Sequence, residues 1–502
     1  MAVRHQQIAA QSLAEAPGQR LDVRYYEWLA KAAPLDGLLN PIPMSDILKS
    51  LTNGSNLPVS TYDLTGGEPE ALYVSVAGVS QYVLEPESCS PIRANALAGQ
   101  SSMSLSDQPE VLLTRSGVTG VAWPHEGRET DVPLVPSGFL IRGVPHPDVP
   151  VQFVAAIVNH PYWRALTHAL SAGKSQDNIS QEMLWKLPFP DLTSENRQRI
   201  ADGYKLLMAD IRVLLDSATD FADACDAILE DQTGVQLPPV EQGRVRTSTV
   251  LTQLLKPGYR LDTRIHDATH RAVQSIIRES AHTTLGALLE GTPTKGSQPT
   301  YDDREGDLLA AFAVATVSIQ DGVVVPELCK PVEEACAAAN PLADGDILVA
   351  VDGEGSVGKS AVLTLPEGAL ATTDSHVSRL RLRSGCNKGD LASAISCFLN
   401  SSWGSIQSNA RVTGATGQIS LGRVDLCEVL LPEALVEKCT EIATGYQALL
   451  RDYVPRSHQI RRLVAAHAVE VTQILCNCSA LSPPEDVSEE EYVKLLADIS
   501  RA

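Results

Sequence analysis

The sequence lacks the apolar segments that carry a chain into or across a membrane. None of its apolar runs reaches the roughly 18 residues that a membrane helix needs. The first 16 residues are polar and mixed in charge, and they contain no apolar signal core. We therefore expect a cytoplasmic protein that has no membrane among its partners.

The ten cysteines lack the spacing of a metal site. No C-x-x-C pair occurs, and the closest two cysteines are Cys476 and Cys478. Others, such as Cys397, have apolar neighbours, which is typical of reduced and buried thiols. The sequence therefore predicts neither a metal site nor a disulfide framework.

Catalytic motifs are also missing. There is no Asn/Asp-Pro-Pro-Tyr/Phe tetrad for methyl transfer to adenine, no clear P-D…E-x-K nuclease pattern and no G-x-S-x-G elbow. The Gly-x-Gly at Gly353 and Gly355 does not continue into a dinucleotide fingerprint. We expect a chain that has no catalytic centre, binds no cofactor and is not an enzyme by itself.

Basic residues are few compared with acidic ones, 40 against 61, and the formal net charge is −21. This charge argues against a simple DNA-binding protein, because a duplex repels a uniformly acidic surface. However, many of the acidic residues lie in two segments of the chain. Eight acidic and two basic residues lie between Asp202 and Asp231, and five more acids lie between Glu485 and Glu491. Such acidic helical segments can face protein partners and leave other surfaces for DNA.

The chain repeats itself at an offset of about 240 residues. Residues 17–24 and 257–264 agree at six of eight positions, and residues 200–207 and 442–449 agree at five of eight. Matches at 178–180 with 418–420 and at Pro190 with Pro432 keep the same order. A chain of 502 residues exceeds one compact core, and an ordered set of matches indicates a duplication.

Each repeat ends in a long helix with a coiled-coil seam. Thr193 or Ser194 is expected to cap the first helix, and Glu195 suits its first turn. Its 29-residue seam spans about 43 Å. The helices either pack on their own domains or pair with each other, and the matching seams favour pairing. Pro455 is expected to interrupt the second helix. The seam positions are Ile200, Tyr204, Leu207, Ile211, Leu214, Ala218, Phe221, Cys225 and Ile228, then Cys439, Ile442, Tyr446, Leu449, Tyr453, Ile460, Leu463, His467 and Ile474.

This anatomy resembles the specificity subunit of type I restriction–modification enzymes. The resemblance covers about residues 18–475 and is carried by the order of its motifs and by the duplication. Arg20-Leu21-Asp22 with Tyr25-Tyr26 resembles the R-L-D-x-x-Y-Y opening of such domains. The segments 345–359 and 414–432 resemble the G-D-I-L strand and turn and the approach to the spacer helix. In the second repeat Arg264-Ile-His266 departs from the opening motif.

The resemblance implies an α/β (α+β) fold with two duplicated target-recognition domains separated by long antiparallel coiled-coil spacer helices. The expected boundaries are an N-terminal segment at 1–16, recognition domain 1 at 17–191, spacer helix 1 at 192–235, a linker or short helix at 236–256, recognition domain 2 at 257–431, spacer helix 2 at 432–480 and an acidic C-terminal tail or helix at 481–502.

The segment from Gly353 to Ser360 fits the P-loop pattern G-x-x-x-x-G-K-[ST] at every defined position. A P-loop must open a helix whose N-terminus faces the phosphates. Here Ala361 to Leu365 is β-like and Pro366 ends it, and the equivalent segment of the first repeat has no lysine. We therefore expect a β-turn-β hairpin.

Candidate DNA-binding residues lie in strands and polar loops. Residues 379–383 alternate arginine and leucine, so one strand face is either a solvated edge or a phosphate-facing stripe. Residues 409–414 are expected to form a polar, Gly-rich loop that could present base readers. The candidates are Arg115, Arg142, Lys174, Ser175, Lys359, Arg379, Arg381, Arg383, Lys388, Arg411 and Thr413, with His125 and Arg128 as weaker ones.

The function expected from the resemblance is DNA recognition without catalysis. Each recognition domain would read half of a bipartite site on double-stranded DNA. Methyltransferase subunits would dock on the helices, and translocase/nuclease subunits would join them. The alternatives are a specificity subunit of another phage-defence methylation system and, of a different class, a P-loop nucleotide-binding protein.

Overall fold

The computed structural model describes most of the chain, in two compact units. The first unit is Met1–Ser217 with Arg456–Ser500, and the second is Ala218–Pro455. The described residues are 23–34, 41–58, 69–80, 82–93, 104–105, 107–116, 118–127, 130–171, 178–217, 221–236, 265, 267–299, 311–353, 356–385, 388–415, 418–451, 455–479 and 488–501. The repeat anchors at 17–22 and 257–264 lie outside them.

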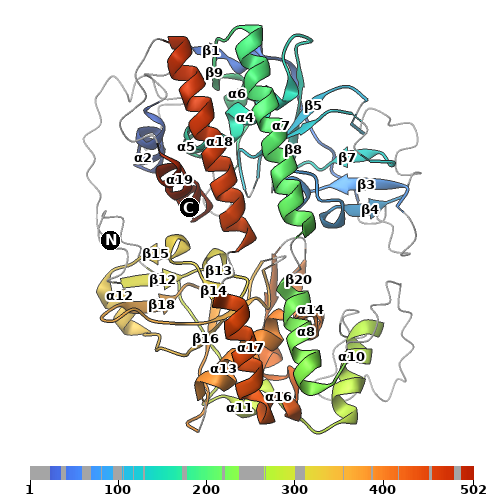
Figure 1. Ribbon diagram of the computed structural model, residues 1–502, viewed down its shortest axis with the longest axis vertical. Helices are drawn as coiled ribbons and strands as arrows, with labels where there is room; N and C mark the ends of the chain where they lie inside the picture. The colour runs from blue at the N-terminus through green and yellow to red at the C-terminus, as the bar shows by residue number, and fades with distance from the viewer. Residues whose placement is uncertain are drawn as a thin grey trace. The chain divides into compact units, whose positions relative to one another are not determined.

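The first unit contains two sheets and a strand pair (Figure 1). The four-stranded antiparallel sheet has the order β2 (Leu48–Asn53), β8 (Leu140–Pro145), β5 (Glu110–Thr114), β6 (Ala122–His125). The three-stranded sheet has the order β4 (Ser90–Ile92), β3 (Ala71–Val74), β7 (Leu134–Pro136), and β3 pairs in parallel with β7. β1 (Pro41–Pro43) pairs with β9 (Pro188–Pro190) just before the long helix.

The second unit repeats this plan. Its four-stranded sheet has the order β11 (Thr294–Lys295), β19 (Val377–Leu380), β16 (Ile347–Ala350), β17 (Ser360–Val362). Its three-stranded sheet has the order β15 (Lys330–Pro331), β12 (Ala311–Val314), β18 (Leu370–Thr373), with β12 and β18 parallel. β10 (His282–Thr284) pairs with β22 (Leu430–Pro432). The strand orders match down to the single parallel pair in each unit, so the predicted duplication is confirmed.

A buried helix lies at the centre of each unit. α4 (Val151–Asn159) is buried at every residue, and α13 (Lys388–Asn400) is buried from Ala392 to Leu399. Apart from Gln152 and Asn159, these buried stretches contain only apolar or small residues, which suits a helix surrounded by other elements. The remaining helices of the first unit are α2 (Val23–Ala32), α5 (Pro161–Leu170), α6 (Gln181–Trp185) and α19 (Glu489–Arg501). Those of the second are α10 (Ala268–Glu279), α11 (Leu285–Leu288), α12 (Glu334–Ala339), α14 (Ser402–Arg411), α15 (Arg423–Cys427) and α16 (Glu433–Glu437).

The long helices pair with each other within each unit. In the first unit α7 (Ser194–Ser217) lies beside α18 (Arg456–Ser479) (Figure 1). Asn196 contacts Cys478 and Tyr204 packs against His467, so the residue numbers along α18 fall as those along α7 rise. The pair is therefore antiparallel. The matching seams predict this pairing, and the antiparallel orientation is the one that the resemblance implies.

In the second unit α8 (Phe221–Thr233) lies beside α17 (Cys439–Arg451) (Figure 1). Lys438 donates to the carbonyl of Gln232, and Phe221 packs against Tyr446, which makes this pair antiparallel too. Residues 218–220 and 452–454 lie outside the described residues, and with them the expected seam positions Ala218 and Tyr453.

Most predicted seam positions are buried, and Leu214, Ile228, Leu449, Leu463 and His467 are half-buried, so the period holds with local shifts. Ile200, Tyr204 and Ile211 are at most 1% exposed, and Ile442 and Tyr446 match them in the second repeat. Asn196 donates its backbone N–H to the hydroxyl of Thr193, so Thr193 caps α7.

The segment that fits the P-loop pattern is a β-hairpin. β16 and β17 pair antiparallel through Ile347–Val362, Leu348–Ala361 and Val349–Ser360. No helix begins at Lys359, so its backbone offers phosphates no helix N-terminus. The hairpin prediction is confirmed, and the nucleotide-binding alternative loses its structural basis.

The loop expected at residues 409–414 is wrong. Residues up to Arg411 belong to α14, and β20 (Val412–Ala415) follows directly and pairs antiparallel with β21 (Gln418–Leu421). The hydroxyl of Ser401 caps the helix by accepting from the N–H of Gly404, and Gln407 and Ser408 are fully buried. Polar composition therefore pointed to a loop where buried hydrogen bonds stabilise a helix.

Among the described residues, none of the helices is sufficiently long and apolar to span a membrane.

Candidate nucleic-acid interface

In the second unit two hairpins that are far apart in sequence meet. Gly353 donates its backbone N–H to the carbonyl of Ile419 at 3.0 Å, and Leu421 donates to the carbonyl of Val351 at 2.7 Å. The turn after β16 can form because Gly353 has φ +97°, in the left-handed region that favours glycine. As a result, the β16–β17 turn, which carries Lys359, is joined to the β20–β21 hairpin, which carries Thr413.

Asp352 is the centre of a polar cluster at this junction. Its carboxylate accepts from Lys295 Nζ at 2.7 Å, and its Oδ2 lies 2.9 Å from His376 Nδ1. Burial by itself raises the pKa of Asp352, but hydrogen bonds from Lys295, Ser420 and His376 outweigh burial and hold the pKa below its ordinary value. The carboxylate therefore stays ionised and holds the side chains of Lys295 and His376 at the surface.

The residues near this junction include types that can bind nucleic acids. The side chains of His376 and Lys295 are 55% and 36% exposed, and Lys359 and Thr413 are exposed. Lysine and hydroxyl groups bind phosphates, and hydroxyl groups and hydrogen-bonding side chains also reach base edges. We call this set the Asp352 rim. It consists of Lys295, Asp352, Lys359, His376, Thr413 and Ser420.

The first unit has an equivalent rim with different chemistry. The bridge between Ser116 and Asn178 corresponds to the bridge between Asp352 and Ser420. The structure therefore sets Asn178 against Ser420, so the sequence match of 178–180 with 418–420 is wrong by two residues. Arg115 Nη1 donates to Asn53 Oδ1 at 3.2 Å, and Ser116 donates to Asn178. Strand register gives the equivalent pairs Asn53 with Lys295, Ser116 with Asp352, and Phe139 with His376.

We call Asn53, Arg115, Ser116, Val118, Phe139 and Asn178 the Ser116 rim. Phe139 is 47% exposed and Val118 is 49% exposed, so this rim presents apolar side chains at its surface. Here the equivalent of His376 is an aromatic ring, and no ion pair at Ser116 corresponds to the one at Asp352 among the described residues. The two rims therefore offer different contacts to a ligand.

The arginine stripe forms, but its head groups bind the protein. Leu380 and Leu382 are buried on the opposite face, which confirms the predicted alternation. Arg379 donates to the carbonyl of Pro341 at 2.9 Å and Arg383 donates to the carbonyl of Leu289 at 2.7 Å. These bonds attach the strand to neighbouring segments.

Arg381 is paired with a buried carboxylate. It makes two bonds to Asp346, at 2.8 and 2.6 Å, and Asp346 is only 2% exposed. Hydrogen bonding to Asp346 raises the pKa of Arg381. In the first unit Arg142 makes a two-bond pair with Glu110, the equivalent of Asp346, at 2.9 Å for both bonds. Strand register, however, makes Arg142 the equivalent of Arg379, so the two acids are paired from different strand positions. Both arginines thus neutralise an acid at the start of a central strand.

The other candidates fall in varied places. Arg411 is 3% exposed; its Nη1 lies 3.1 Å from His270 Nε2 and donates to the carbonyl of Gln407 at 2.9 Å, so it is a core arginine with almost no surface to offer a duplex. His125 is buried in β6. Lys388 is exposed at the first residue of α13. Lys174, Ser175 and Arg128 lie outside the described residues.

Sequence reasoning missed Lys295, His376 and Phe139. An Asp-Gly pair at Asp352 marks a turn, but nothing local connects that turn to a lysine 57 residues earlier. Only the pairing of β11 with β19 places Lys295 beside it. Knowledge of the strand register would have been needed to find these residues.

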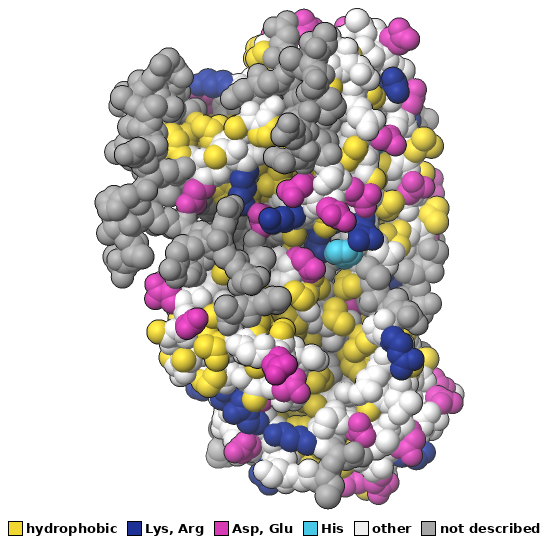
Figure 2. Space-filling view, turned by 60° about the vertical axis from the view of Figure 1, so that its left-hand side comes forward, with side chains coloured by type: hydrophobic (Ala, Val, Ile, Leu, Met, Phe, Trp, Pro, Cys, Tyr) yellow, Lys and Arg dark blue, Asp and Glu magenta, His cyan; other side chains and the backbone are white. Residues whose placement is uncertain are grey.

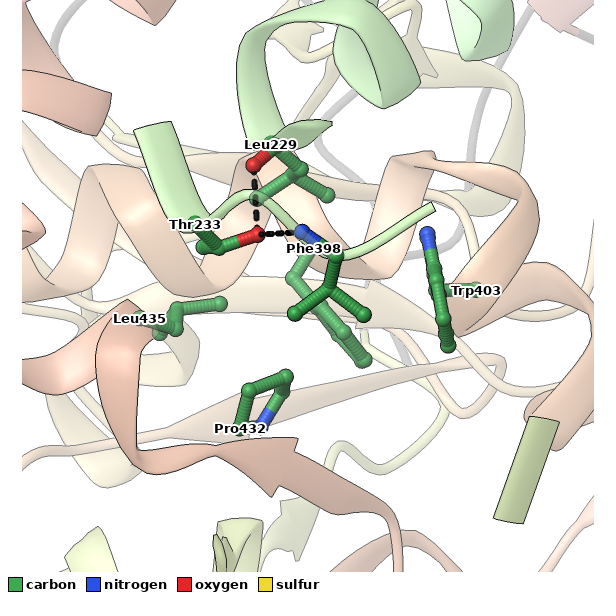
Figure 3. A pocket seen from close by; sticks show the side chains of 7 residues that line it. Leu229, Thr233, Phe398, Trp403, Pro432 and Leu435 are labelled. Atoms are coloured by element: carbon green, nitrogen blue, oxygen red, sulfur yellow. Dashed lines mark hydrogen bonds between the residues drawn. The ribbon is translucent and has the colours of Figure 1, made fainter. Parts of the chain in front are cut away.

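Two further surface features complete the description. On the face seen in Figure 2, basic and acidic side chains of the described residues are interspersed. An apolar pocket in the second unit is lined by Leu229, Thr233, Val235, Phe398, Trp403, Pro432 and Leu435 (Figure 3). The Thr233 hydroxyl donates to the carbonyl of Leu229 and accepts from the N–H of Val235, so it is satisfied locally. No group of metal-binding side chains gathers in the part of the chain that the structure describes.

No family model and no curated protein sequence matches this chain. It is similar to the S subunit of a type I restriction–modification system from M. genitalium, with 12% identity, 87% of this chain and 94% of that chain covered, and a TM-score of 0.32. It is also similar to the HsdS subunit from Thermoanaerobacter tengcongensis, with 15% identity, coverages of 86% and 96%, and a TM-score of 0.28. It is similar to a third structure as well, with 14% identity, coverages of 92% and 97%, and a TM-score of 0.26. That structure concerns the complex assembly and conformational transition of the type I R-M system.

Proposed function

We propose that this chain is the DNA sequence-recognition subunit of a type I restriction–modification complex and has no catalytic activity of its own. One observation carries the proposal. The chain is a duplication in which each copy combines a polar, strand-borne rim with one member of each antiparallel helix pair. Duplicated readers on helical supports suit a DNA site made of two half-sites with a gap of set length.

In this proposal the Asp352 rim and the Ser116 rim each contact one half-site. Lys295 and Lys359 supply cations for phosphates, and His376, Thr413 and the amide of Asn53 can reach base edges. Lys388, Lys174 and Ser175 are further candidates for DNA contacts. The paired helices act as the spacer that sets the gap.

The outer face of α7 is the proposed docking surface for methyltransferase subunits, which translocase/nuclease subunits would join. Leu206 is 69% exposed and Val213 is 64% exposed. Together with Asp202, Ala209 and Asp216 they form an exposed stripe at spacings of four and three residues. Exposed apolar side chains bordered by charge are typical of protein interaction surfaces. A methylation system of another kind would use the same surface.

The deciding experiment is methylome sequencing of the host with and without this gene. We expect one bipartite methylation motif to disappear in the deletion strain and to return with the gene. The purified chain, incubated with plasmid and either S-adenosylmethionine or ATP, is expected to neither methylate nor cleave DNA. An unchanged methylome, or robust turnover by the pure chain, contradicts the proposal.

A further inference from the structure

The same three-way hydrogen-bond junction occurs in both units. In the first, Asn159 at the end of α4 donates from Nδ2 to the hydroxyl of Tyr204 on α7 at 2.6 Å. In the second, Asn400 at the end of α13 donates from Nδ2 to the hydroxyl of Tyr446 on α17 at 3.0 Å. Both tyrosines are seam residues of the spacer helices.

The side chain of each asparagine also bonds the main chain of a strand. Asn159 accepts from the N–H of Ala122 at 2.9 Å and donates to its carbonyl at 2.7 Å. Asn400 accepts from the N–H of Ser360 at 2.9 Å and donates to its carbonyl at 2.8 Å. Ala122 is the first residue of β6 and Ser360 is the first residue of β17. These are the strands that leave the turns of the two rims.

Burial makes each junction sensitive to geometry. Asn159, Tyr204 and Tyr446 are each 1% exposed, and Asn400 is half-buried. Burial is the main cause that raises the pKa of both tyrosines, so their hydroxyls remain protonated. A buried amide or hydroxyl costs free energy when its partners move away, whereas an apolar pair of the same size would tolerate sliding. The junction thus favours one position of strand against helix.

We infer that Asn159–Tyr204 and Asn400–Tyr446 are positioning pairs that hold each DNA-reading rim at a set place on its spacer helix. This rests on the proposed function and deepens it. The pairs touch no DNA. They determine how strictly the complex measures the gap between the half-sites, while the rims determine which bases are read.

The test uses the assembled complex with Tyr204→Phe or Tyr446→Phe, each of which removes one hydroxyl. Tyr492→Phe is the matched control, because its hydroxyl is equally buried and lies 2.7 Å from Thr472 Oγ1, between two helices and away from both sheets. Binding is measured by fluorescence anisotropy on duplexes with the native gap, a gap one base pair longer or shorter, and one altered base in either half-site.

We expect Tyr204→Phe and Tyr446→Phe to reduce discrimination against the wrong gap by about five- to tenfold, which matches the loss of one buried hydrogen bond. Discrimination against altered bases should stay as in the unmodified complex, and Tyr492→Phe should change neither. Unchanged gap discrimination, or an equal loss in the control, overturns the inference alone. A complex that no longer folds with either substitution assigns the pairs to stability and also overturns it. An unmodified complex without any bipartite site overturns the proposed function, and the inference with it.

Discussion

The Asp352 rim and the Ser116 rim lie on equivalent strands but carry different side chains. Lys295, Asp352 and His376 form an ionic cluster in the second unit, where the first has Asn53, Ser116 and the exposed ring of Phe139. The supporting bonds, by contrast, recur in both. Each unit has its Asn–Tyr junction, and in each unit the equivalent buried acid is paired with an arginine, although the two arginines come from different strand positions. The duplication thus keeps the scaffold and varies the surface, which suits two readers of different half-sites.

The largest effect is expected from changing the spacer that both readers share. Four residues inserted after Leu214 lengthen α7 by about 6 Å and turn it slightly more than once. At about 3.4 Å per base pair, the gap should grow by roughly two base pairs while both half-sites are kept. Methylome sequencing of cells with the variant is the measurement. Altered half-site bases with the old gap would show that the helix does not set the spacing.

Either unit can be destabilised by removing the arginine that pairs with its buried acid. Arg142→Ala leaves Glu110 without its main partner, and Arg381→Ala does the same to Asp346. Removing one partner of a buried pair costs about 3–5 kcal/mol of the free energy of unfolding. The Arg381 side chain is 33% exposed and that of Arg142 14%, so water should lessen the loss at Arg381.

Denaturant unfolding of the two variants measures this difference. Arg383→Ala is the control, because the side chain donates to the carbonyl of Leu289 and forms no ion pair with a buried acid among the described residues. Equal and small losses in all three variants would mean that the acids are protonated or hydrated in the folded chain.

Lys295→Asn gives the Asp352 rim the residue that the Ser116 rim has at the equivalent position, Asn53. The substitution removes a cation that contacts Asp352, so affinity should fall and base discrimination should change by about 1–3 kcal/mol at one position of one half-site. The other half-site should be unaffected. Competition binding with single-base variants of the motif provides the readout, and equal changes in both half-sites would contradict separate readers.

Phe139→Ala tests the apolar rim. The ring is 47% exposed, so the free energy of unfolding should change little. If the ring contacts a thymine methyl or a base face, base discrimination should fall at one position of the half-site that the Ser116 rim contacts. The expected loss is about 1 kcal/mol, the smallest value typical of a specific base contact. His376→Ala is the matched variant in the second unit. Loss at the same half-site for both variants would refute the comparison of the rims.

The smallest effect is expected from Lys359→Ala. Because Lys359 follows a hairpin turn, nucleotide-dependent activity of the complex should remain unchanged. A lost phosphate contact lowers the slope of log affinity against log salt by about 0.9. Salt titrations of DNA binding measure that slope, and a clear fall in nucleotide binding would instead support the P-loop reading.

Local patterns predicted the elements well where the pattern repeats over many residues. The seam from Ile200 to Ile211 and its counterpart at Ile442 and Tyr446 are buried as expected. The hairpin from Ile347 to Val362 followed from β-like residues and from Pro366. Failure came at Asn409 to Arg411, where a polar sequence forms a helix because Gln407 and Arg411 find buried partners from other segments.

The sequence by itself determined the duplication, the helix seams and the hairpin, because each depends on a short period or on an offset within one chain. Only the tertiary structure decided which polar residues are at the surface. Arg411 and Arg381 have the composition of DNA contacts, yet one is buried and the other is bound to Asp346. Lys295 and Asp352 form a site because strand pairing brings together residues far apart in the chain. Residue type specifies what a side chain can bind, whereas packing specifies what it meets.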